Sequence, residues 1–161
     1  MMMGDPHVIP PAPLTVAPPQ EAYDYEYFAQ RLADPWLLEQ SLAVRPLRMP
    51  FLLVPVGGSR RGGYFSVPYR CLGLMVHDLV LGQPGFPNPR LRWSPYPDTS
   101  HVVEWGERSP MSWGPVDDIT LGCFYGYSEQ AIDQFMNRHT STSRTPQTPS
   151  SATGHRSPAA P

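Results

Sequence analysis

The chain has 161 residues and a formal net charge of −2, with 22 prolines, and its twelve lysine-plus-arginine side chains are all arginine. This length suits one ordinary domain. The absence of lysine excludes a lysine Schiff base, a catalytic lysine amine and the lysine of a nucleotide-binding phosphate loop.

The sequence contains no segment that predicts export or insertion into a membrane. It has no run of 18 apolar residues, and its first residues lack the basic head and apolar stretch of a signal peptide. Cys71 and Cys123 are too few for a disulfide framework. We therefore expect a cytoplasmic protein with two reduced, largely buried thiols and no membrane contact. The oligomeric state is left open.

Both ends of the chain differ from the middle in composition. Residues 1–20 contain six prolines and one charged side chain, and residues 139–161 are mostly Ser, Thr, Pro and Ala. Neither end has the periodic apolar residues that would offset the entropy cost of ordering the chain. We predict a disordered Pro-rich segment over 1–20, one globular domain over 21–138, and a disordered Ser/Thr/Pro-rich tail over 139–161.

Two helices are predicted at the start of the globular part. Aromatic and apolar residues spaced three and four apart predict a helix over 21–33. Asp34 suits a helix N-cap and Pro35 a first helical turn, so a second, short helix is expected to reach about residue 42. Trp36 is the expected anchor of that second helix.

Three strands are predicted next. The segment 43–48 suits an edge strand, because Pro46 has no N–H to donate. The apolar run 51–56 predicts a second strand and 64–67 a third. The glycine-rich connector 57–63 between these two suits a hairpin loop.

Two further helices are expected, over 69–82 and 128–138. The first has an apolar face and ends at Gly82, with a proline shortly after it. Ser128 suits the N-cap of the second helix.

A second hairpin is predicted from two alternating segments, 90–94 and 101–105. One register places the apolar pairs on one face and the opposite charges on the other. Its pairs are Trp93 with Val103, Leu91 with Trp105, and Arg92 with Glu104.

These segments together predict an α+β fold. The tight connectors between strands favour antiparallel pairing. We expect a single domain, with an antiparallel sheet of about five strands, helices on one face of that sheet, and disordered termini.

Positive charge is concentrated in the middle of the chain. Residues 40–77 contain no acidic residue and five arginines, which are Arg45, Arg48, Arg60, Arg61 and Arg70. Two explanations stay open. Either the acidic flanking segments fold against this stretch and neutralise it internally, or the stretch forms an exposed basic face.

The connector 57–63 is the strongest candidate for a functional site. Its backbone N–H groups could form an anion nest beside two guanidinium groups. The plain alternative is a mobile hairpin tip with solvated arginines. Gly63 stands where a phosphate loop has its lysine, which excludes a nucleoside triphosphate loop. The candidate binding residues are Gly58, Arg60, Arg61, Gly62 and Gly63.

Binding is the function that this pattern favours. We expect a small, non-enzymatic binding or regulatory protein that contacts an acidic protein surface through the connector. The alternative partner is nucleic acid, with Arg60 and Arg61 on phosphates and neighbouring aromatic side chains on bases.

Catalysis and metal binding have less support. A thiol enzyme would need Cys71 or Cys123 beside His77 or His101, and the sequence has no local signature of such a pair. His101 and Glu104 fall on opposite faces of their predicted strand, which is poor geometry for a metal. We therefore expect no catalytic residue, no cofactor and no metal.

Several motifs are distinctive as sequence. They are Val54–Gly58 with Arg60–Tyr64, Pro84–Pro87, Arg92–Tyr96, His101–Gly106 and Phe124–Glu129. In these motifs the chain resembles a family of small, uncharacterised actinobacterial proteins that share a domain of unknown function. The resemblance spans most of residues 23–136. It implies no activity, cofactor or catalytic residue, and it fits an arginine-only composition and a cytoplasmic bacterial setting.

Overall fold

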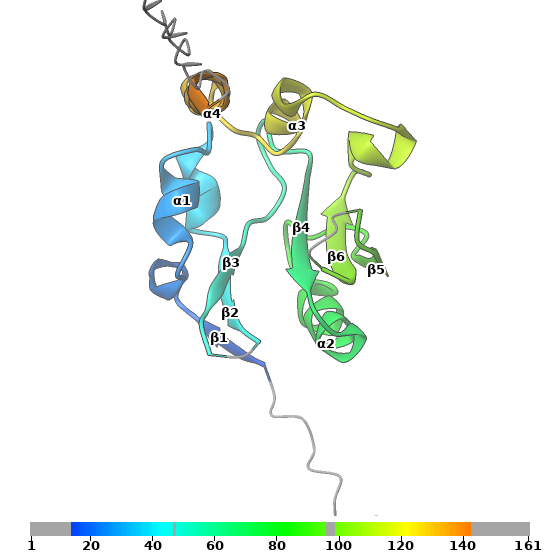
Figure 1. Ribbon diagram of the computed structural model, residues 1–161. Helices are drawn as coiled ribbons and strands as arrows, with labels where there is room; N and C mark the ends of the chain where they lie inside the picture. The colour runs from blue at the N-terminus through cyan, green and yellow to red at the C-terminus, as the bar shows by residue number, and fades with distance from the viewer. Residues whose placement is uncertain (1–13, 47, 96–98, 143–161) are drawn as a thin grey trace, which may run out of the picture.

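A computed structural model describes residues 14–46, 48–95 and 99–142 (Figure 1). Its strands are β1 (Thr15–Ala17), β2 (Leu42–Arg45), β3 (Phe51–Leu53), β4 (Gly62–Val67), β5 (Arg90–Trp93) and β6 (His101–Gly106). Its α-helices are α1 (Tyr25–Ala29), α2 (Arg70–Val80), α3 (Asp118–Phe124) and α4 (Glu129–Thr142). Three short 3₁₀ helices are η1 (Pro19–Glu21), η2 (Pro35–Leu38) and η3 (Pro110–Trp113).

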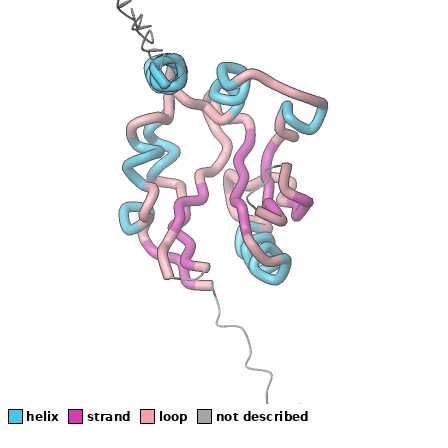
Figure 2. The backbone as a smooth tube through the Cα atoms, in the orientation of Figure 1, coloured by secondary structure: helices cyan, strands magenta, loops and turns pink. Residues whose placement is uncertain are grey.

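Within the described residues, the strands form two antiparallel sheets of three strands, in the orders β1-β2-β3 and β4-β6-β5. Figure 2 shows the two groups of strands side by side, with helices around them. The predicted α+β class is confirmed. The prediction of one sheet with about five strands is wrong, because the strands divide between two sheets.

The division arises at the connector between β3 and β4, which was predicted to be a hairpin loop. Apart from one bridge between Gly57 and Arg60, its backbone groups bond to distant segments, and β3 does not pair with β4. The Val56 N–H donates to the Gly85 carbonyl at 2.8 Å, and the Arg61 N–H donates to the Phe124 carbonyl at 2.9 Å. The connector therefore leads out of the first sheet and into the second, where β4 pairs with β6.

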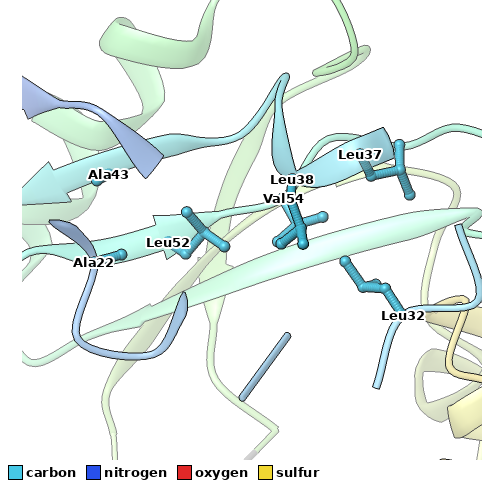
Figure 3. Close-up of a cluster of buried hydrophobic side chains, with 7 residues drawn as sticks. All are labelled: Ala22, Leu32, Leu37, Leu38, Ala43, Leu52 and Val54. Carbon is cyan, nitrogen blue, oxygen red and sulfur yellow. The ribbon is translucent and has the colours of Figure 1, made fainter. Parts of the chain in front are cut away.

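The first sheet is buried on both faces, so the prediction of helices on one face alone is wrong for it. Neighbouring residues of β2 point to opposite sides, and both Ala43 and Val44 are fully buried. Val44 belongs to a cluster with residues of α2 and β6. The cluster on the other side contains Ala22, Leu32, Leu37, Leu38, Ala43, Leu52 and Val54 (Figure 3).

The predicted helices vary in accuracy. The helix over 69–82 is confirmed as α2, but only Tyr25–Ala29 of the segment 21–33 is α-helical. The short helix after Asp34 is the 3₁₀ helix η2. Ordered structure also extends past the predicted domain limits, because β1 precedes residue 21 and α4 ends at Thr142. The remainder of both predicted disordered ends lies outside the described residues.

The second hairpin forms in a register two residues away from the predicted one. Leu91 pairs with Val103 and Trp93 with His101. Trp93 is consequently 75% exposed and stacks on the His101 ring, with 4.6 Å between ring centroids. The predicted contact of Arg92 with Glu104 survives as a diagonal ion pair at 3.4 Å.

The segment between α3 and α4 is joined to the end of α1. Leu32 and Tyr127 form an isolated antiparallel bridge. The Ala33 N–H donates to the Gly126 carbonyl at 2.9 Å, and the Ser128 N–H donates to the Arg31 carbonyl at 2.8 Å. These bonds bring aromatic residues from both halves of the chain to one end of the molecule.

Candidate functional site

The Gly/Arg connector has a tight turn at its tip, held by the protein's own carboxylate. Gly57 and Arg60 exchange two backbone hydrogen bonds of 2.9 and 3.0 Å around Gly58 and Ser59. The Asp34 carboxylate accepts from the Ser59 N–H at 2.8 Å and from its hydroxyl at 2.6 Å. These hydrogen bonds lower the pKa of Asp34. The tip of the connector is therefore bound to a carboxylate of this chain, through Ser59 alone among the described residues.

Arg60 turns into the protein, so the expectation that both arginines point into solvent is wrong for this one. Its side chain is 4% exposed, and its Nη1 donates to the Tyr125 carbonyl at 2.9 Å. The guanidinium lies over the rings of Phe28 and Tyr125, 5.9 and 5.7 Å from their centroids. It also donates to the hydroxyl of Tyr127.

The buried guanidinium of Arg60 has no carboxylate partner in the described chain. Its polar neighbours are tyrosines, which are neutral near pH 7, and its Nε has no hydrogen-bond partner among the described residues. Burial lowers the pKa of Arg60, which nevertheless stays charged because an arginine side chain does not deprotonate in proteins. An uncompensated positive charge is therefore held inside this end of the molecule.

The close approach to Arg60 depends on Gly126. Its φ of +73° lies in the left-handed region, and a Cβ there would come within 2.8 Å of the Arg60 backbone nitrogen. Residues other than glycine rarely adopt such a φ, and a side chain could not fit in this space. Gly126 therefore lets the end of α3 lie directly on the connector.

Arg61 lies outside, as predicted. Its guanidinium forms an ion pair with Glu107, and both side chains are exposed. Such a surface pair stabilises by less than about 1 kcal/mol. Gly62 and Gly63 are buried in β4 against the rings of Phe124 and Trp105. The candidate residues of the connector are therefore not gathered into a single exposed surface.

The two explanations for the basic stretch each hold in part. Of its arginines, Arg61 is neutralised by a carboxylate and Arg60 is buried. Arg45, Arg48 and Arg70 are exposed, and none of these three forms an ion pair with a described residue. The acidic flanks therefore do not cancel the stretch as a whole.

A pocket of about 320 Å³ is lined by Tyr125 and Tyr127, which are also neighbours of Arg60. Its walls come from α1, β4, α3, α4 and the α3–α4 segment, and its aromatic side chains come from all of these except α3. The residues that line it are Tyr27, Arg31, Tyr64, Asp118, Leu121, Gly122, Tyr125, Tyr127, Ala131, Ile132 and Phe135. We call this the tyrosine pocket.

Hydrogen bonds connect the buried guanidinium to the tyrosine pocket. Arg60 donates to the Tyr127 hydroxyl, and the Tyr127 hydroxyl is hydrogen-bonded to that of Tyr27. Burial raises the pKa of Tyr127, so its hydroxyl stays neutral. The rim carries one charge of each sign, Arg31 and Asp118, and Arg31 lies 3.9 Å from the centroid of the Tyr27 ring. Because Arg60 lies behind the pocket, the charges around the pocket add up to a net positive charge.

Sequence reasoning missed this pocket. Its signal was the two tyrosine-rich segments, 23–27 and 125–127, which lie far apart in the chain. The first segment was predicted to form a helix face, and the second was used only as part of a motif. Neither segment contains a local sequence signal that predicts contact with the other.

The residues considered for catalysis do not come together. His77 contacts the Asp78 carboxylate and the Pro89 carbonyl, and His101 contacts Ser100 and Trp93. No hydrogen bond among the described residues joins either histidine to a cysteine. Cys71 and Cys123 are both free and exposed, so the prediction of buried thiols is wrong.

Two other findings concern metal sites and membrane-spanning helices. In the part of the chain that is described, no group of three or more His, Cys, Asp or Glu side chains could hold a metal ion. None of the described helices has both the length and the apolar composition needed to cross a membrane.

The geometry defines an α+β protein with an aromatic pocket backed by a buried cation. The chain belongs to a family of unknown function (DUF6302), which matches residues 16–160. No curated protein and no solved structure matches it. The resemblance to a domain of unknown function is thereby confirmed.

Proposed function

We propose that this is a non-enzymatic binding protein that takes an acidic group into the tyrosine pocket. The ligand is a carboxylate on a short aromatic or apolar stem, as in an acidic segment of a partner protein or a small aryl acid. The observation that carries the proposal is the guanidinium of Arg60, buried behind the pocket without a carboxylate. A cytoplasmic location, an actinobacterial origin and a regulatory role stay expectations from the sequence.

The electrostatic argument begins with the cost of burying a charge. A desolvated ion is costly unless an opposite charge or several hydrogen bonds compensate it. Arg60 has a carbonyl, a hydroxyl and two aromatic faces, but its Nε is unsatisfied. A carboxylate that enters the pocket would supply the missing negative charge, and the low local dielectric would strengthen the attraction.

The shape and polarity of the pocket support the same class of ligand. Its volume of about 320 Å³ is small for a ligand site and suits a single ring or one side chain. Most of the wall is aromatic or aliphatic, and the tyrosine hydroxyls and Arg31 supply hydrogen-bond donors. Tyrosine and arginine are also the side chains that dominate binding energy at protein interfaces.

Three isosteric probes test the sign of the charge: phenylacetate, neutral phenylacetamide and cationic phenethylamine. We expect phenylacetate to shift the tyrosine ring signals in NMR spectra with a dissociation constant of about 1 mM, which is reasonable for so few atoms. The amide should bind more weakly and the amine not at all. Equal binding of all three probes, or no binding of phenylacetate, would refute the proposal.

Location is tested with a matched pair of variants on α4. Ala131 lines the pocket and Gln134 is exposed on the same helix. Ala131→Leu should fill the pocket and abolish the shifts, whereas Gln134→Leu should leave them unchanged. Titration with peptides that end in a phenylalanine carboxylate, compared with their carboxamide forms, then separates a protein partner from a small acid.

Nucleic acid is the second candidate partner. The observation that favours it is the exposure of Arg45, Arg48 and Arg70 without ion pairs. If it is correct, single-stranded DNA of random sequence will bind with an affinity that falls steeply with added salt. The double variant Arg48→Ala with Arg70→Ala should weaken that binding. Affinity that does not depend on salt would exclude this candidate.

A further inference from the structure

A second hollow lies between the two sheets and is distinct from the tyrosine pocket. It is an open groove of about 710 Å³. Its lining is almost entirely apolar and consists of Pro46, Arg48, Met49, Phe51, Phe65, Ser66, Val67, Pro68 and Leu72. We call it the β4 groove, because four consecutive residues at the end of β4 and just beyond it form one wall.

Strand β4 is an edge strand, and its outer edge borders this groove. Among the strands that the structure describes, the order β4-β6-β5 gives β4 a single neighbour, β6. The Glu107 N–H donates to the Arg61 carbonyl, so Arg61 and every second residue after it bond to β6. Phe65 and Val67 belong to that set. The N–H and carbonyl of Ser66 therefore point away from β6, towards the outer edge.

No described residue forms a hydrogen bond with the outward N–H or carbonyl of Ser66. An unpaired strand edge is a template for another extended segment, which would gain main-chain hydrogen bonds there. A lipid chain or a helix could fill the apolar groove but could not pair with the backbone of Ser66. The edge therefore favours an extended peptide as the occupant.

The charge of the groove indicates which peptide fits. Arg48 lines it, is exposed, and forms no ion pair with any described residue. None of the lining residues is acidic. In an extended peptide alternate side chains face the same way. Apolar residues would enter the groove beside Met49 and Leu72, and an acidic residue would meet Arg48.

We propose that the β4 groove binds an extended segment of a partner protein in which apolar and acidic residues alternate, and that this segment adds a strand to β4 at Ser66. This surface is separate from the tyrosine pocket, and the proposal does not depend on the function proposed for that pocket.

Two synthetic peptides with blocked ends test the proposal on the full chain: Val-Glu-Val-Glu-Val and Val-Lys-Val-Lys-Val. We expect the acidic peptide to shift the amide signals of residues 65–67 and to slow hydrogen exchange at the Ser66 amide. The lysine peptide should bind about fivefold more weakly, as expected for the loss of one exposed ion pair.

A charge-reversal variant sharpens the test. Arg48→Glu should invert the preference, so that the lysine peptide binds better than the acidic one. Arg108 is exposed and does not line the groove, so Arg108→Glu serves as the control and should leave the preference unchanged. A preference that Arg48→Glu does not alter, or binding without protection of Ser66, would overturn the proposal.

Occupation by the chain itself is a separate outcome. If the Ser66 amide exchanges slowly in the full chain and quickly after removal of residues 1–13, the N-terminal segment fills the groove. That result would overturn the assignment to a partner protein. Fast exchange in the full chain without peptide supports the assignment.

Discussion

The tyrosine pocket and the β4 groove use arginine in opposite ways. Arg60 lies behind the pocket, desolvated and bonded to tyrosines, whereas Arg48 stands in the open groove without an ion pair. A buried cation is part of the core that supports it, so removing it disturbs the fold. An exposed cation can be replaced without a structural penalty, and salt screens its interactions. The same residue type is therefore part of the packed interior in one region and independent of it in the other.

The largest expected effect is the loss of stability when the buried arginine, Arg60, is removed. Arg60→Ala should lower the free energy of unfolding by about 3 kcal/mol, because it leaves a cavity and removes the donor to Tyr125 and Tyr127. Arg61→Ala, its sequence neighbour, should cost less than about 1 kcal/mol. Urea unfolding of both variants measures the difference, and equal losses would contradict the contrast between inside and outside.

The next largest effect is expected when the close approach of Gly126 to Arg60 is disrupted. Gly126→Ala combines a positive φ with a clash against Arg60 and should destabilise by about 2 kcal/mol. Gly82 has a similar φ of +79° with open space around it, so Gly82→Ala should cost only about 1 kcal/mol. Thermal unfolding of the pair separates the clash from the φ penalty. If the two variants unfold alike, the contact of α3 with the connector is not tight.

A smaller effect is expected at the tip of the connector and depends on pH. Because hydrogen bonds from Ser59 lower the pKa of Asp34, its carboxylate contributes stability above the unfolded pKa near 3.8. That contribution is lost as the pH falls through the folded pKa. The difference in urea midpoint between the wild type and Asp34→Asn should therefore be present at pH 7 and shrink as the pH falls below 3.8. A difference that grows on acidification would show that Asp34 has another role.

The smallest effect is expected in the β4 groove. Arg48→Glu should change the free energy of unfolding by less than about 0.5 kcal/mol, as is usual for an exposed position without specific contacts. The same variant should leave phenylacetate binding in the tyrosine pocket unchanged. A loss of stability above 1 kcal/mol would show that Arg48 supports the fold and would weaken the contrast between the two regions.

The parts of the fold that sequence reasoning predicted are those fixed by local pattern. Helix α2 was correct because its apolar spacing and its terminating glycine are both local signals. The β5–β6 hairpin was correct in its existence and wrong in register by two residues. A slip of two residues keeps every side chain on its original face, so alternation alone cannot detect it.

What sequence reasoning could not predict depends on contacts between distant segments. Two adjacent arginines of the connector are equivalent by type and position, and the chain buries only one of them. That choice is made by Tyr125 and Tyr127, the first of which lies 65 residues after Arg60 in the sequence. The division into two sheets has the same origin, since the connector bonds to Gly85 and Phe124 and β3 does not pair with β4.

The hydrogen bonds that join the α3–α4 segment to the end of α1 have a consequence for biosynthesis. The walls of the tyrosine pocket run from Tyr27 to Phe135, so no shorter nascent chain can enclose a ligand there. Until Tyr125 is translated, the guanidinium of Arg60 lacks the carbonyl and the ring that cover it. Translation of α4 then supplies the last wall of the pocket.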